Sequence, residues 1–239
     1  MAFNFKPRRA EGGILFRLAR VVSKLIVWFL AISIGLTVVY RFVPPPITLT
    51  MLLDLNGFTR DWTPLSRIDR NMVSAVIAAE DGKFCRHDGF DREAIEQAIE
   101  RNAKGGRLRG GSTISQQTAK NVFLWQGEGW TRYLRKGLEA WFTVLIELIW
   151  DKRRIMEVYL NVAETGIGTY GAEAGAQRYY KKSAARLSRV EAARIAAALP
   201  SPKKRGVSNP RGFTRRYGNT IAARIGTIRR DALDACIYD

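Results

Sequence analysis

Residues 80–91 read EDGKFCRHDGFD and follow an apolar stretch whose spacing predicts a helix that breaks at Gly82. This segment places Glu80 and Asp81 close to Phe84 and to His87, the only histidine of the chain. A carboxylate at the end of an apolar helix is partly desolvated, which raises its pKa toward use as a general base. The ordinary alternative is a helix terminus that frays into a polar turn, although a carboxylate there opposes the helix dipole.

A second segment, residues 110–121, reads GGSTISQQTAKN. Ser112 or Thr113 can cap the helix that follows, and glycines before a helix expose backbone N–H groups. No lysine follows the glycines at the place that a phosphate-binding P-loop requires. The helix is expected to carry a strip suited to sugar amides and phosphate oxygens, formed by Gln116, Gln117, Lys120 and Asn121. An exposed polar face is the alternative.

A third segment, RKGLEA at 135–140, places Arg135 and Glu139 four residues apart on one helix face. An exposed ion pair is the ordinary explanation, and such a pair contributes little to stability.

The N-terminal region contains an uncharged run, LIVWFLAISIGLTVVY, at residues 25–40. With its apolar flanks it predicts a transmembrane helix at 21–43, since about 20 residues cross a bilayer. A basic tail at 1–20 precedes it, which places the N-terminus in the cytoplasm. A linker or membrane-proximal segment at 44–64 follows and starts with three prolines. The alternatives are a cleaved signal peptide, for which YRFVPPP is a poor cleavage site, and a buried core helix.

Charge and cysteine content restrict the function less than these segments do. The formal net charge of +17 favours polyanionic partners, but it does not choose between nucleic acid, anionic lipid and pyrophosphate compounds. One histidine excludes a His-rich metal site. Cys85 and Cys236 leave two possibilities open, one disulfide or two unpaired thiols, and the unpaired state is the simpler expectation.

The remaining pattern is helical, so the fold class is expected to be mainly α. Residues 47–55 are expected to form a short strand or a membrane-lying segment, folded sequence is expected from Trp62, and 104–113 is expected to be a flexible basic loop. Ser188 is expected to cap a late helix that Pro200 ends. The further predicted helices span 91–101, 131–150, 151–161, 172–180, 189–199 and 219–236.

Taken in order, these segments resemble family 51 of the peptidoglycan glycosyltransferases. Residues 80–91 match E-D-x-x-F-x-x-H-x-G-x-D, residues 110–121 match G-G-S-T-I-x-Q-Q-x-x-K-N, and residues 135–139 match R-K-x-x-E. Residues 153–161 and 171–182 are similar to the fourth and fifth motifs of the family. The resemblance implies a lysozyme-like glycosyltransferase domain at 65–239. Because no transpeptidase domain of the Ser-x-x-Lys type follows, the monofunctional type is expected.

The resemblance also implies a reaction and a location. The partners would be lipid II, the nascent glycan strand and the membrane, with penicillin-binding and division proteins as further candidates and no nucleic acid. The reaction would invert configuration, form β-1,4 bonds and release undecaprenyl pyrophosphate. The expected location is the bacterial inner membrane, with a single span and the catalytic domain in the periplasm.

The roles of individual residues follow from the same resemblance. Glu80 would be the general base, and Glu139 would act near the pyrophosphate, directly or through Mg²⁺ or Mn²⁺, with no organic cofactor and no assigned metal ligands. Between Asn121 and Arg135 the family usually has a further arginine near the pyrophosphate. In this sequence Glu128 lies near that position, and Arg132 is the expected substitute for the arginine. The expected substrate contacts are Asp81, Phe84, His87, Ser112, Thr113, Gln117, Lys120, Asn121, Arg135 and Lys136.

Two other functions remain as alternatives. A membrane-anchored lytic hydrolase with a lysozyme-like fold needs an acid and a group that handles water, but it leaves Lys120 and Arg135 unexplained. A membrane-anchored basic scaffold explains the charge but not the ordered motifs.

Overall fold

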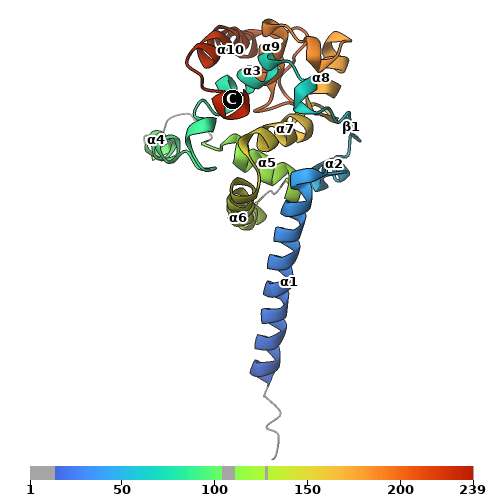
Figure 1. The fold of residues 1–239 in the computed structure, drawn as a ribbon, viewed down its shortest axis with the longest axis vertical. Helices are drawn as coiled ribbons and strands as arrows, with labels where there is room; N and C mark the ends of the chain where they lie inside the picture. The colour runs from blue at the N-terminus through green and yellow to red at the C-terminus, as the bar shows by residue number, and fades with distance from the viewer. Residues whose placement is uncertain (1–13, 104–110, 127–128, 239) are drawn as a thin grey trace, which may run out of the picture.

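The computed structural model describes residues 14–103, 111–126 and 129–238. One long helix, α1, leads into a mainly helical domain, with α10 and α9 at the end remote from α1 (Figure 1). The predicted loop at 104–113 lies largely outside the described residues, as do Glu128 and most of the basic tail. The helices are α1 (Ile14–Phe42), α2 (Leu49–Leu52), α3 (Arg70–Glu80), α4 (Arg92–Ala103), α5 (Ile114–Phe123), α6 (Thr131–Ile149), α7 (Lys152–Val162), α8 (Ala172–Tyr180), α9 (Arg189–Ala198), α10 (Gly212–Arg230) and α11 (Ala235–Tyr238).

Two groups of helices bury the core. In the first, α3 packs against α9 and α10, and its side chains Val73, Val76 and Ile77 are fully buried. In the second, α5 packs between α6 and α7. Full burial of each such aliphatic side chain contributes about 1.5–3 kcal/mol, so the apolar spacing read from the sequence fixes which faces meet.

A small sheet packs beside α8 and α9. It has the order β1-β3-β2, built from β1 (Thr59–Arg60), β2 (Glu164–Gly166) and β3 (Thr169–Tyr170). The strand β1 is parallel to β3, with Thr59 opposite Thr169, whereas β2 is antiparallel to β3. The sheet therefore ties the segment after α1 to the turn after α7.

The helix α1 is long and apolar enough to cross a membrane, with a mean hydropathy of 2.2 and 11% of its most apolar window buried. So little burial rules out the core-helix alternative. Its C-terminal half docks on the domain through two small polar residues, Ser33 and Thr37. The Trp141 Nε1–H donates to Ser33 Oγ at 3.2 Å, and the Trp150 Nε1–H donates to the Thr37 carbonyl at 2.7 Å.

Some predicted element boundaries were wrong by a few residues at an end. The helix α1 begins at Ile14 and so extends seven residues beyond the predicted membrane span, because Arg17 and Arg20 fit a helix that continues beyond its apolar part. The helix α10 begins at Gly212, not at 219, and ends at Arg230. The predicted strand or membrane-lying segment at 47–55 contains the helix α2, and folded sequence starts before Trp62, because Met51 is buried in the core.

The two cysteines form a disulfide, which corrects the expectation of unpaired thiols. Cys85 lies in the 3-10 turn Phe84–Arg86, directly after α3, and Cys236 lies in α11. They are 151 residues apart in the sequence, so only the tertiary fold brings them together. The bond attaches the C-terminal segment to the turn that follows Glu80.

Candidate active site

Glu80 is the last residue of α3, and its carboxylate is largely enclosed. Its Oε2 accepts a hydrogen bond from Gln117 Nε2 at 2.8 Å, whereas its buried Oε1 has no hydrogen-bond partner among the described residues. Burial raises the pKa of Glu80, although the hydrogen bond from Gln117 opposes that rise. A desolvated carboxylate with one free oxygen is suited to accept a proton from a bound ligand.

Two residues orient this carboxylate. The Tyr159 hydroxyl donates to Gln117 Oε1 at 3.3 Å, which turns the amide nitrogen of Gln117 toward Glu80. Tyr159 is fully buried and burial keeps its pKa well above its usual value, so its hydroxyl remains a donor. At the end of α3, the Tyr217 hydroxyl donates to the Ala79 carbonyl at 2.6 Å. The base is therefore held by contacts from α5, α7 and α10.

A cluster of cations lies next to this base. The Arg135 Nη1 donates to Glu139 Oε2 at 2.8 Å, and Lys136 Nζ binds Glu139 Oε1. The Arg135 and Glu139 side chains are only 12% and 4% exposed, so the expectation of an ordinary surface pair was wrong. Lys120 lies within the fields of Glu139, Arg135 and Glu80, and burial lowers its pKa.

The cluster carries more cationic than anionic charge. Glu139 neutralises one of the three cations Lys120, Arg135 and Lys136, and Arg135 Nε is buried without a hydrogen-bond partner in the described part of the chain. Buried, unpaired donors with excess positive charge favour an anionic ligand. Lys136 Nζ also donates to Ser112 Oγ at 3.3 Å, which brings Ser112 to the same cluster.

Other residues that were predicted to contact substrate make hydrogen bonds within the protein or are buried. Asp81 accepts from the Ile114 N–H at 3.0 Å and from His87 Nε2 at 2.9 Å. Because the Gly89 N–H donates to His87 Nδ1 at 3.2 Å, the proton of the imidazole lies on Nε2. Phe84 is fully buried in the core and does not line a cleft.

The cap of α5 is one of the two residues that the sequence offered for it. Thr113, not Ser112, forms the cap, in a capping box with Gln116. Thr113 further donates to the Gly89 carbonyl at 2.6 Å. Gln116 therefore leaves the predicted polar strip, while Gln117, Lys120 and Asn121 remain in it and face a cavity.

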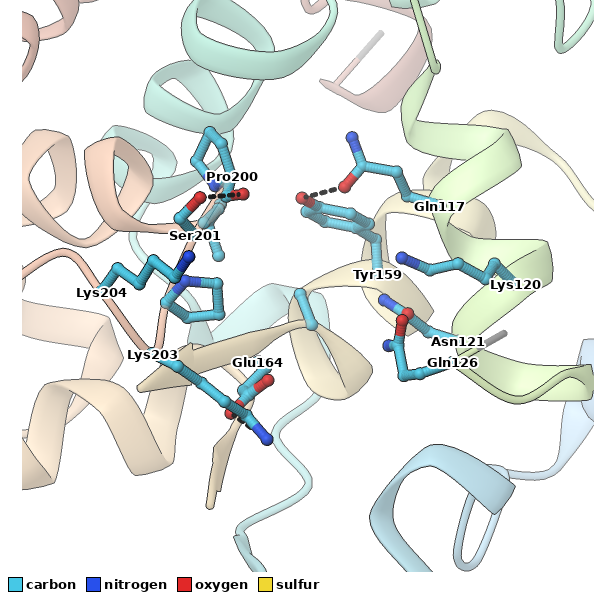
Figure 2. Close-up of a pocket in the computed structure, with 13 residues that line it drawn as sticks. Gln117, Lys120, Asn121, Gln126, Tyr159, Glu164, Pro200, Ser201, Lys203 and Lys204 are labelled. Atoms are coloured by element: carbon cyan, nitrogen blue, oxygen red, sulfur yellow. Dashed lines mark hydrogen bonds and ion pairs between the residues drawn. The ribbon is translucent and has the colours of Figure 1, made fainter. Parts of the chain in front are cut away.

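That cavity has a volume of 380 Å³ and lies between α5 and the turn after α9 (Figure 2). Gln117, Lys120 and Asn121 form one wall, and residues 199–204 form the opposite wall. Tyr159 and Glu164 lie between the two walls. Gln117, which donates to Glu80, therefore lines the same space as Lys120.

The sequence did not single out several residues that border this space. Tyr159 lies in the fourth motif, which could have flagged it, whereas Glu164 and Lys203 carried no signal. Arg205 is close enough to lower the pKa of Glu80 and donates to the Ala197 carbonyl at 2.9 Å. Arg132, the expected substitute for the family's further arginine, is exposed in the first turn of α6.

The residues present do not fit a divalent ion at Glu139. Both of its carboxylate oxygens are held by Arg135 and Lys136, so neither is left to coordinate a metal. In the described part of the chain, no group of three or more His, Cys, Asp or Glu side chains could hold a metal ion. The requirement for Mg²⁺ or Mn²⁺ stays a prediction without a binding site.

This arrangement defines a class of site: an enclosed carboxylate that can deprotonate a hydroxyl, beside cations that can stabilise an anionic leaving group. The family model for transglycosylases matches residues 48–225, and the chain belongs to that family of glycosyltransferases.

Relatives cover nearly the whole chain. The biosynthetic peptidoglycan transglycosylase of Caulobacter vibrioides is 49% identical over 232 residues, which cover 95% of this chain and 99% of the relative. Proteins with the same name from Rhodospirillum centenum and Pseudomonas aeruginosa are each 48% identical, over 227 and 207 residues. These matches cover 93% and 83% of this chain, and 97% and 88% of the relatives.

Proposed function

We propose that this transglycosylase polymerises peptidoglycan glycan strands from lipid II. The observation that supports it most directly is the enclosed Glu80 carboxylate, with its free Oε1, whose hydrogen-bond donor Gln117 lines the same cavity as Lys120. Lys120 in turn lies within the fields of Glu80, Arg135 and Glu139. Glu80 accepts the proton of the acceptor 4-hydroxyl. The acceptor oxygen then bonds to the anomeric carbon of the donor while the bond from that carbon to the pyrophosphate oxygen breaks, with inversion to a β-1,4 linkage.

The leaving undecaprenyl pyrophosphate takes the electron pair of the broken bond. Lys120 and Arg135 neutralise the charge that develops on it, and Glu139 holds Arg135 and Lys136 in place. The same cations disfavour the lytic alternative, because hydrolysis of a glycan has no anionic leaving group to stabilise.

We further propose that α1 anchors the catalytic domain on the periplasmic side of the bacterial inner membrane. The basic residues before α1 support a cytoplasmic N-terminus, and a disulfide suits an oxidising compartment. The helix α1 first contacts α6 near Phe29, where Phe29 packs against Trp141. The section of α1 from Ile14 to Trp28 is therefore left to enter the membrane, and it is about 22 Å long at 1.5 Å per residue. Since a hydrocarbon core is about 30 Å thick, the bilayer would also reach the exposed apolar residues of α6, such as Leu148.

The test is polymerisation of labelled lipid II by the full chain in detergent, with and without a phosphoglycolipid inhibitor of the moenomycin type. We expect lysozyme-sensitive polymer that the inhibitor abolishes. The variant Glu80→Gln should make none while retaining its helical circular dichroism. Release of fragments from preformed peptidoglycan, without polymer, would assign the chain to the lytic alternative.

A further inference from the structure

Arg205 lies in the turn after α9, and the reaction as proposed so far gives it no role. Its Nη1 donates to the carbonyl of Ala197, in the last turn of α9, at 2.9 Å. The guanidinium also lies over two aromatic rings of α10, 5.1 Å from the centre of the Phe213 ring and 5.9 Å from that of Tyr217. These contacts hold a half-buried cation between α9 and α10.

Tyr217 connects this cation to the helix that carries the base. Its hydroxyl donates to the carbonyl of Ala79, the residue before Glu80, at 2.6 Å. The helix α3 also packs directly against α9 and α10, the two helices that Arg205 bridges. The guanidinium of Arg205 is therefore fixed close to the end of α3, two contacts away from the backbone that presents Glu80.

Glu80 needs a nearby cation if it is to act as a base. Burial raises its pKa, and the negative end of the α3 dipole disfavours a carboxylate at the same place. Two cations oppose this rise, and Arg205 lowers the pKa of Glu80 more than Lys120 of α5 does. The neighbouring carboxylate of Asp81 acts in the opposite direction, and burial keeps Tyr159 of α7 protonated and uncharged. Arg205 is therefore the stronger of the two cations that favour an ionised Glu80.

The two cations differ in what an anionic substrate does to them. Lys120 lines the cavity, so a pyrophosphate bound there neutralises its charge (Figure 2). The same pyrophosphate adds negative charge near Glu80, which favours the protonated carboxyl. Arg205 does not occur among the described residues that line the cavity, and its guanidinium is held by Ala197 and the two aromatic rings. Its charge therefore remains available to Glu80 when the substrate is bound.

We propose that Arg205 is a positioning residue that keeps Glu80 ionised while an anionic substrate occupies the cavity. It acts through its fixed charge and through Tyr217, and it does not touch the substrate. This role rests on the proposed function, because it requires Glu80 to accept a proton beside a bound pyrophosphate. The cations of the site then have two separate tasks: Lys120 and Arg135 stabilise the leaving group, and Arg205 serves the base.

The test is the pH profile of lipid II polymerisation by the full chain in detergent. The variant Arg205→Gln removes the charge, so the rise of the rate with pH should move to higher pH, while the rate at the high-pH plateau stays close to that of the parent chain. The rise of kcat, which reports the substrate complex, should move further than that of kcat/KM, which reports the free chain. The variant Arg205→Lys keeps the charge and should restore most of the parent profile.

Two further variants separate charge from packing. Arg216→Gln removes the same charge from an exposed arginine next to Tyr217 on α10, and it should leave both pH profiles unchanged. Tyr217→Phe removes the hydrogen bond to Ala79 but no positive charge, so it should move the profile less than Arg205→Gln does.

A purely structural role for Arg205 gives a different result. Arg205→Gln and Arg205→Lys would then lose the same share of the rate at every pH, and that outcome, or a pH profile that Arg205→Gln leaves in place, would overturn the proposal while the parent chain still polymerises lipid II. A parent chain that makes no polymer would instead remove the proposed function. Infrared titration of the Glu80 carboxyl, assigned by its loss in Glu80→Gln, then tests the contact alone: Arg205→Gln must protonate Glu80 at higher pH than the parent does, and an unchanged titration would overturn the role of Arg205.

Discussion

Removing the disulfide between Cys85 and Cys236 should destabilise the domain strongly. The bond closes a loop of 151 residues, and the chain-entropy relation for a loop of that length gives about 5 kcal/mol as an upper limit. Measured losses for native disulfides are about 2–5 kcal/mol. A loss of about 3 kcal/mol would lower the Tm by roughly 6–12 °C in a domain of this size.

The assay is thermal unfolding in detergent, followed by circular dichroism, with and without dithiothreitol. The double variant Cys85→Ser/Cys236→Ser should melt below the parent chain, and dithiothreitol should lower the Tm of the parent but not that of the variant. Because Cys85 lies in the turn directly after the Glu80–Asp81 pair, we also expect the variant to lose activity below the Tm of the parent. A parent Tm that ignores the reductant, although mass spectrometry shows the thiols reduced, would refute the reasoning.

Three further predictions concern the reaction. Burial raises the pKa of Glu80, so kcat/KM should rise with pH through that raised pKa. The variant Gln117→Leu removes a hydrogen bond that lowers the pKa of Glu80, so it should move this rise to higher pH. The control variant Gln97→Leu on α4 should leave the pH profile unchanged. The variant Lys120→Gln should lower kcat by about 10²–10³, which is the loss seen in other enzymes when one fixed donor that stabilises developing charge is removed. The control variant Arg224→Gln, on the exposed face of α10, should leave kcat unchanged. Chelation by EDTA should reduce the rate less than Glu139→Gln does, since Arg135 and Lys136 already hold Glu139; an equal loss in both experiments would contradict this account.

The sequence by itself determined the helical fold class, the candidate membrane helix and the helix that presents Glu80. Apolar spacing and capping residues act over a few positions, so Ser188 marks the start of α9 without any knowledge of distant contacts. The order of the motifs also indicated the family, which the comparisons confirm.

Only the tertiary structure decided which of the predicted residues line the cavity. Phe84, Thr113 and Gln116 belong to motifs as fully as Gln117 and Lys120 do, yet packing turns the first three into the core or into a cap. The pairing of Cys85 with Cys236 and the cavity beside Lys120 likewise bring together segments that are distant along the chain. Local sequence patterns specify elements because the interactions that form them are local, whereas a cavity and its charges arise where α5, α7 and the turn after α9 meet.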